Sequence, residues 1–198
     1  MGNKKLSSLV LLSLSSALVL AACGGEGSTA DSSESAGANG SDQVLNLIES
    51  AEIPTMDSVQ ATDTVAFTAL SNVNEGLYRQ GLDGTVELGI AAEDPTVSED
   101  GLVYTFTIRD EANWSNGEPV TAEDFVYSWR KLVDPAEAAS YSYMMAGVIA
   151  NATEIIDGAV APEELGVKAI DEKTLEITLT SPVPYFKDLL TLAMFFPQ

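Results

Sequence analysis

Histidine is absent from this chain of 198 residues, and cysteine occurs once, at Cys23. Histidine is the commonest metal ligand in proteins and the commonest general acid or base, so its absence removes both roles. A Ser–His or Cys–His nucleophilic pair is excluded for the same reason. A single cysteine also excludes an intrachain disulfide and any CxxC motif. We therefore expect no metal site, no cofactor and no disulfide framework.

Basic residues are also scarce, because nine Lys and Arg stand against 30 Asp and Glu, giving a formal net charge of −21 at pH 7. Nucleic-acid binding depends on clustered Lys and Arg side chains, so we expect no nucleic-acid partner. Attraction to anionic lipid headgroups is disfavoured for the same reason. Net charge governs solubility and association rather than fold, and we interpret the acidity as a source of solubility.

Catalytic motifs with a strict spacing are absent as well: the chain contains no GxGxxG, GxxxxGK[ST], HExxH or GxSxG pattern. Two adjacent acid pairs occur, Glu123–Asp124 and Glu163–Glu164. Acids at the start of a helix interact favourably with the helix dipole and need no catalytic explanation. The loop at residues 110–118 lacks the acid density of a calcium-binding loop. We predict that the protein is not an enzyme.

The first 22 residues have the layout of a secretory signal peptide. Lys4 and Lys5 form a positive start, residues 6–20 are apolar apart from serines, and small residues follow. The apolar stretch is short for a membrane-spanning helix, although a retained N-terminal anchor is the alternative interpretation. We expect residues 1–22 to be a signal peptide.

The sequence Leu20-Ala21-Ala22-Cys23 resembles the bacterial lipobox, in which a leucine and two small residues precede a cysteine that is modified. The resemblance implies cleavage before Cys23 and attachment of diacylglycerol to its sulfur. It therefore predicts a lipoprotein anchored in the cell membrane and facing the extracytoplasmic side. Two acyl chains suffice for stable membrane attachment. Residues 24–42 contain no large apolar side chain, which predicts that 23–42 form a flexible tether.

The folded part is predicted to span residues 43–198, with a mixed α/β (α+β) fold. The clearest signals are alternating polarity around residues 103–108 and a helix whose N-terminus carries Thr121 and Asp124 at capping-box spacing. The expected elements are a strand at 44–48, a loop at 53–64, a helix at 64–77 capped by Thr62 or Asp63, a turn and strand within 81–93, a hairpin element at 98–110, a turn and helix within 114–134, further helix within 136–160, two strands within 165–186 and a helix at 183–195.

Several segments together resemble the family 5 extracellular solute-binding proteins. They are "NEGLY" at 74–78, "YTFTIRDEANWSNG" at 104–117, "NWSNGEPVTAEDFVYSWRKLVDP" at 113–135 and "LGVKAIDEKTLEITLTSPVPYF" at 165–186. Their order along the chain is the order in the family. The Ser-Pro-Val-Pro-Tyr-Phe run and the Tyr-rich segment at 141–143 are most similar to the oligopeptide-binding branch.

The resemblance implies a two-lobed clamp of the periplasmic-binding-protein type that closes on an oligopeptide and delivers it to the permease of an ABC importer. It also implies a monomer without catalytic residues. Carried over to this sequence, the ligand-binding positions are Thr62 and Thr64, in a segment that lines the family's cleft, and Tyr143. Where some relatives carry an acid, this chain has Thr62.

Family members are much longer than this chain, so we expect residues 43–198 to be only the N-terminal part of the solute-binding domain, with the second lobe missing. If the protein is a related binding lipoprotein with another cargo, that cargo is a pheromone peptide, a nickel chelate or heme. A truncated fragment that does not bind is a further alternative.

Overall fold

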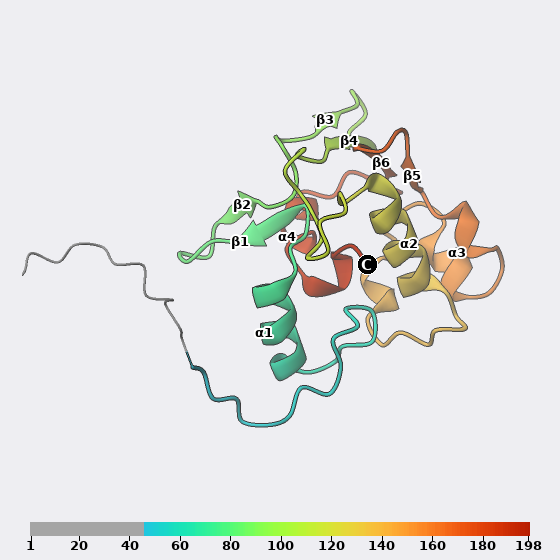
Figure 1. Cartoon of the computed structure of the whole chain (residues 1–198). Coiled ribbons are helices and arrows are strands. Elements are labelled where there is room, and N and C mark those ends of the chain that lie inside the picture. The colour runs from blue at the N-terminus through green and yellow to red at the C-terminus, as the bar shows by residue number, and fades with distance from the viewer. Residues whose placement is uncertain (1–45) are drawn as a thin grey trace, which may run out of the picture. The chain divides into compact units, whose positions relative to one another are not determined.

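The computed structural model describes residues 46–198, and Figure 1 labels its helices and strands. The predicted signal peptide and the predicted lipidated tether lie outside the described residues. The helices are α1 (Thr64–Val73), α2 (Ala122–Val133), α3 (Ala152–Ile156) and α4 (Phe186–Leu189), and 3₁₀ turns span Ser142–Met144, Pro162–Glu164 and Ala193–Phe195. The strands are β1 (Tyr78–Gln80), β2 (Val86–Leu88), β3 (Thr96–Val97), β4 (Val103–Thr107), β5 (Val167–Ala169) and β6 (Thr174–Thr178).

The larger sheet has four antiparallel strands in the order β3-β4-β6-β5. Its centre is the pairing of β4 with β6, in which Phe106 lies opposite Leu175. The predicted alternation is confirmed, because Phe106 and Ile108 are buried while Thr107 between them is exposed. The predicted pair of strands within 165–186 is also confirmed, as β5 and β6 pair across the Asp-Glu-Lys turn.

Helix α2 packs against β5 and β6, so helix and sheet enclose the main core between them (Figure 1). The predicted capping box is present: the Thr121 side chain accepts from the Asp124 N–H, and the Asp124 carboxylate accepts from the Thr121 N–H. The predicted apolar stripe is buried along its whole length, consisting of Phe125, Val126, Trp129, Leu132 and Val133. Local capping and helical periodicity therefore agree with the tertiary packing at this element.

Helix α1 is capped by Asp63, whose Oδ1 accepts from the backbone N–H groups of Val65 and Ala66 at 2.9 and 3.0 Å. The prediction that this helix continues to residue 77 is wrong. The backbone of Asn74 is extended, with φ −134° and ψ 160°, and the chain leads into β1 instead. Strand β1 was not predicted, and it pairs with β2 across the expected Asp-Gly turn.

Three further predictions need correction. Residues 136–160 are not one long helix, because Gly147 and Gly158 have positive φ angles that end each short turn. The helix predicted at 183–195 is confined to Phe186–Leu189, since the backbone at Leu192 is extended. Residues 46–48 form no strand, because no strand of the described residues lies beside them to satisfy their backbone groups.

The C-terminal segment 195–198 is held in place by side-chain donors. Trp129 Nε1 donates to the Phe195 carbonyl at 2.9 Å, and Ser128 Oγ donates to the Phe196 carbonyl at 2.7 Å. The Asn74 side chain, at the end of α1, donates to the Pro197 carbonyl at 3.2 Å. The segment is thereby fixed to both α1 and α2, which defines one wall of the pocket described below.

Candidate functional site

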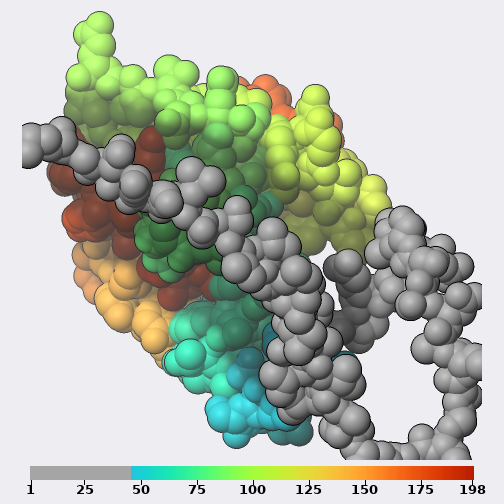
Figure 2. Space-filling view, turned by 90° about the vertical axis from the view of Figure 1, so that its left-hand side faces the viewer, coloured from blue at the N-terminus to red at the C-terminus, as the bar shows by residue number. Residues whose placement is uncertain are grey.

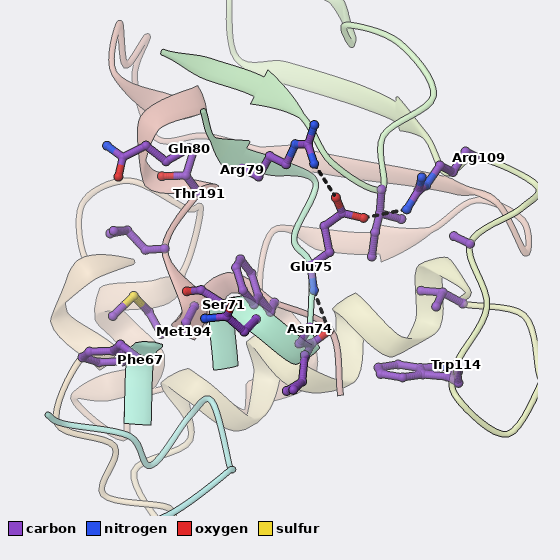
Figure 3. A pocket seen from close by; sticks show the side chains of 18 of the residues that line it. Phe67, Ser71, Asn74, Glu75, Arg79, Gln80, Arg109, Trp114, Thr191 and Met194 are labelled. Atoms are coloured by element: carbon purple, nitrogen blue, oxygen red, sulfur yellow. Dashed lines mark hydrogen bonds and ion pairs between the residues drawn. The ribbon is translucent and has the colours of Figure 1, made fainter. Parts of the chain in front are cut away.

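A pocket of about 1280 Å³ opens between the end of α1, strand β1, the loop that follows β4, the Tyr-rich turn at 141–144 and residues 191–196. Figure 2 shows one face of the molecule, on which the green surface of the β1–β2 region adjoins the dark red surface of the C-terminal residues. In Figure 3, Phe67 and Met194 lie at one end of the pocket and Arg109 and Trp114 lie at the other. The pocket is therefore built from segments that are far apart in the sequence.

Glu75 is the centre of an ion cluster on the pocket wall (Figure 3). Its Oε2 accepts from Arg109 Nη2 at 2.6 Å, and its Oε1 lies 4.0 Å from Arg79 Nη1. Arg79 also pairs with Glu87 of β2 at 3.1 Å. The cluster ties the β1–β2 hairpin to the end of β4, and it neutralises both arginines that line the pocket.

Aromatic side chains line the end of the pocket at which Phe67 lies. The Tyr141 ring meets Phe67 edge-on, with the centroids 5.7 Å apart, and lies 6.0 Å from the ring of Tyr143. Tyr143 is 60% exposed, although an aromatic side chain of this size is usually well covered in a folded domain. An exposed tyrosine in a concave surface is available to pack against a ligand, with its ring giving apolar area and its hydroxyl a hydrogen bond.

The lining contains four carboxamide side chains in addition to the hydroxyl groups of serine, threonine and tyrosine residues, and the carboxamides are Asn72, Asn74, Gln80 and Asn113. Each carboxamide carries both donors and an acceptor. A peptide main chain likewise presents both N–H donors and C=O acceptors along its length. Asn74 already uses both of its groups, because it donates to the Pro197 carbonyl and accepts from the Glu75 N–H. Asn72 and Asn113 each use only their donor, on the Thr68 and Glu111 carbonyls, so they and Gln80 are the carboxamides suited to bind an extended peptide backbone.

A second polar group, formed by Tyr78, Asp94 and Lys187, fixes strand β1. The buried Tyr78 donates from its hydroxyl to Asp94 Oδ1 at 2.7 Å, and Lys187 Nζ approaches the same oxygen at 2.7 Å. Burial, followed by the hydrogen bond to Asp94, raises the pKa of Tyr78 far above its ordinary value. The hydrogen bonds from Lys187 and Tyr78 lower the pKa of Asp94. The tyrosine thus stays a neutral donor, and the group fixes the base of the hairpin.

The structure places one of the three predicted ligand-binding residues in the pocket wall and the other two outside it. Tyr143 lines the pocket. Thr62 and Thr64 are exposed at the start of α1 and are not among the pocket-lining residues. The assignment of all three residues to ligand binding stays a prediction. Cys23, the predicted lipidation site, lies outside the described residues.

Sequence reasoning missed Glu75, Arg79 and Arg109 as pocket residues. Glu75 and Arg109 are 34 positions apart, and no local pattern links them. The only signal that the sequence carries at residues 74–78 is the resemblance to the family. Trp114 both lines the pocket and donates to Asp124 Oδ2 at 3.2 Å.

Within residues 46–198, no helix has the length and apolarity that crossing a bilayer requires. The same part of the chain holds no grouping of three or more His, Cys, Asp or Glu side chains placed to bind a metal ion.

Comparison with known proteins finds bacterial peptide-binding proteins both among curated sequences and among solved structures. The chain is 38% identical over 194 residues to the oligopeptide-binding protein OppA of Bacillus subtilis (strain 168), covering 98% of this chain and 35% of that protein. Among solved structures, Listeria monocytogenes OppA bound to peptide is 49% identical with a TM-score of 0.75, covering 78% of this chain and 30% of that one. The structure of the pheromone receptor PrgZ is 45% identical with a TM-score of 0.70, and the match covers 72% of this chain and 28% of that one. The chain thus spans about a third of the length of these relatives.

The predicted fold, a mixed α/β portion of a periplasmic-binding-protein-like structure, is confirmed by these structural neighbours. The family model described as "Bacterial extracellular solute-binding proteins, family 5 Middle" matches residues 85–198, which is more than half of the chain. That stretch runs from β2 to the C-terminal segment and includes most of the pocket wall. The chain belongs to family 5 of the bacterial extracellular solute-binding proteins.

Proposed function

We propose that the chain is part of a lipid-anchored, extracytoplasmic receptor that captures oligopeptides and delivers them to an ABC importer. The observation that carries the proposal is the pocket, which combines the exposed ring of Tyr143 with the carboxamide side chains of Asn72, Gln80 and Asn113. Its support from relatives is the 49% identity to an OppA whose structure was solved with a bound peptide. The receptor acts as a monomer and carries out no reaction on its cargo.

The physical basis of broad peptide capture is recognition of the main chain. Carboxamide groups bind N–H and C=O groups that every peptide has in common, as strand addition does in other peptide receptors. Aromatic rings then give apolar area that accepts many side chains without strict shape selection. In a two-lobed clamp, closure over the peptide removes water from these hydrogen bonds and strengthens them.

Isothermal titration of the full-length receptor, to which we assign this chain as a part, with short peptides tests the binding function. We expect heat from tri- and tetrapeptides of unrelated sequence, and none from free amino acids. A nickel chelate and heme are titrated in parallel, because they are the cargoes of the alternative hypothesis. Tight binding of either, without heat from any peptide, contradicts the oligopeptide assignment.

The lipid anchor is tested independently of cargo. Cys23→Ala removes the only thiol of the chain and should abolish incorporation of labelled palmitate. It should also release the protein from membranes or leave its signal peptide uncut. Ser28→Ala, in the predicted tether, is the matched control and should be labelled normally. Unchanged labelling of Cys23→Ala would refute the anchor.

A pheromone peptide is the second candidate cargo, and the 45% identity to the pheromone receptor PrgZ favours it. Such a receptor should prefer one hydrophobic peptide over random sequences of equal length by a large factor. Competition titration with a mixed-sequence peptide library distinguishes a pheromone receptor from a general oligopeptide receptor. Uniform affinities across the library support the general oligopeptide receptor, whereas one dominant peptide supports the pheromone receptor.

A further inference from the structure

Trp114 lines the pocket at the end opposite Phe67 (Figure 3). Its indole ring is half-buried and packs partly against the main core. The other tryptophan of the chain, Trp129, is fully buried in that core and donates to a backbone carbonyl. A tryptophan that is only half covered at a concave surface leaves apolar ring area open to a ligand.

The backbone around Trp114 is fixed by the loop to which it belongs. The Trp114 N–H donates to the Glu118 carbonyl at 2.8 Å, and the Gly117 N–H donates to the Trp114 carbonyl at 2.9 Å. At the base of the loop, the Val120 N–H donates to the Ala112 carbonyl at 2.9 Å. These bonds determine where the Trp114 backbone lies, and they leave the orientation of its ring to the side-chain contacts.

One carboxylate holds the ring by its polar end. Trp114 Nε1 donates to Asp124 Oδ2 at 3.2 Å, and the same oxygen accepts from the Thr121 backbone N–H at 2.8 Å. The second bond is half of the capping box of α2, and the other half runs from the Asp124 N–H to Thr121 Oγ1 at 3.4 Å. The Asp124 carboxylate is therefore shared between the helix end and the pocket wall. A hydrogen bond to a charged acceptor is stronger than one to a neutral acceptor, so it is well suited to fix a large ring.

We propose that the indole ring of Trp114 packs against the bound peptide, and that Asp124 is a positioning residue that holds the ring in its binding orientation. This inference rests on the proposed peptide-binding function. Asp124 does not itself line the pocket, so it acts through Trp114. Because the ring is already held in one orientation, binding costs less side-chain entropy than it would with a freely turning ring.

The contact of Trp114 with peptide is tested in the full-length receptor, with the tripeptide Ala-Phe-Ala as the probe. Trp114→Ala should raise the Kd from isothermal titration about ten-fold, because tryptophans are among the side chains that contribute most at binding surfaces. Trp114→Phe keeps a ring but loses the N–H donor, and it should raise the Kd about three-fold. An unchanged Kd in Trp114→Ala would overturn the inference and leave peptide binding intact. If the wild-type receptor binds no peptide, the proposed function itself fails.

The positioning role of Asp124 is tested by a double-mutant cycle. Asp124→Ala should raise the Kd about three-fold when Trp114 is present. It should have no further effect in the Trp114→Phe variant, where the indole donor is already missing. Asp124→Asn, whose carboxamide oxygen still accepts both hydrogen bonds, should restore the wild-type Kd. Equal effects of Asp124→Ala in both backgrounds would show that it acts only through the stability of α2, and would overturn the positioning role.

Thr121→Ala is the matched control, because it weakens the same capping box and leaves the bond between Trp114 and Asp124 in place. It should lower the thermal unfolding midpoint of the receptor and leave the Kd for Ala-Phe-Ala unchanged. A rise in Kd equal to that of Asp124→Ala would contradict a role that runs through the ring.

Fluorine NMR follows the ring itself in receptor that contains fluorotryptophan. The resonance that is missing from Trp114→Phe is that of Trp114. Ala-Phe-Ala should shift this resonance in the wild type, and Asp124→Ala should shift it without peptide, because the indole loses its hydrogen-bond acceptor. A Trp114 resonance that saturating peptide does not move would overturn the contact with the ligand.

Discussion

Lys131 Nζ on α2 lies 2.7 Å from Oδ2 of Asp57, and this ion pair joins residues 74 positions apart. Gln198 bonds to both partners, accepting from Lys131 at 3.0 Å and donating to Asp57 Oδ1 at 2.7 Å. The pair therefore fastens the loop before α1 and the C-terminal segment to α2.

This ion pair should stabilise the fold in a pH-dependent way. Burial alone would raise the pKa of Asp57, but hydrogen bonds from Lys131 and Gln198 outweigh it and lower the pKa. A lowered carboxyl pKa contributes stability above the unfolded value of about 4, and this is lost as pH falls through the folded value. We expect a double-mutant cycle of Asp57→Asn and Lys131→Met, from urea unfolding, to give a coupling of about 1 kcal/mol near neutral pH that vanishes in strong acid.

The matched control is the pair of Lys168 with Glu176 at 2.8 Å, in which the Lys168 side chain is 62% exposed against 19% for Lys131. Solvent screens an exposed pair, so its coupling should be only about 0.3 kcal/mol. Equal couplings for the two pairs would contradict the view that partial burial gives the Asp57 pair its strength.

Ser128→Ala should destabilise the protein by about 1–2 kcal/mol, because it leaves the buried Phe196 carbonyl without its donor. Ser128 itself is fully buried, so water does not replace the lost hydroxyl without rearrangement. Ser140→Ala, at an exposed position, is the control and should change the free energy of unfolding by less than about 0.5 kcal/mol. A silent Ser128→Ala variant would show that the C-terminal segment is not held by this bond.

Gly166→Ala should cost about 2 kcal/mol, because an added Cβ would lie 2.7 Å from the Ala150 Cβ and 2.9 Å from the Thr178 carbonyl oxygen. The backbone at this crossing has little room to move, since Gly166 bonds to both segments. Gly81→Ala is the comparison, because its nearest neighbour is the end of the flexible Glu87 side chain. Thermal or urea unfolding should rank Gly166→Ala well below Gly81→Ala in stability, and the reverse order would be inconsistent with this packing.

Ala138→Gly should stabilise the protein by about 0.5–1 kcal/mol, although most substitutions destabilise. Ala138 has a φ of 50°, in the left-handed region where a Cβ is strained and glycine is not. Ala136→Gly, two residues earlier and not at positive φ, should instead destabilise slightly by loosening the unfolded chain. A loss of stability in both variants would count against strain at residue 138.

Tyr143→Ala should raise the Kd for a bound peptide about five-fold, which corresponds to about 1 kcal/mol. Because the side chain is 60% exposed, the free energy of unfolding should change little. Tyr185 is similarly exposed, at 56%, but does not line the pocket, so Tyr185→Ala is the matched control for peptide titration. Unchanged affinity in Tyr143→Ala would remove this residue from the proposed binding surface.

Sequence patterns were most reliable where the forces are local. The Thr121–Asp124 capping box and the apolar stripe of α2 involve residues three or four apart, and both are present in the structure. The alternation that places Phe106 in the core is equally local. The long helix expected at 136–160 failed because apolar residues alone do not report the positive φ angles at Gly147 and Gly158. Propensity is a weak prior there, and tertiary packing decides.

The sequence by itself determined the class of the protein: no histidine, an acidic composition, a capped helix beside a strand of alternating polarity, and motifs ordered as in family 5. Only the tertiary structure decided which residues form the pocket. Glu75 and Arg109 meet across 34 positions, and Asn74 reaches Pro197 across 123, because antiparallel strand pairing and helix packing close the chain on itself. Such long-range contacts depend on the whole fold, so no local pattern in the sequence contains them.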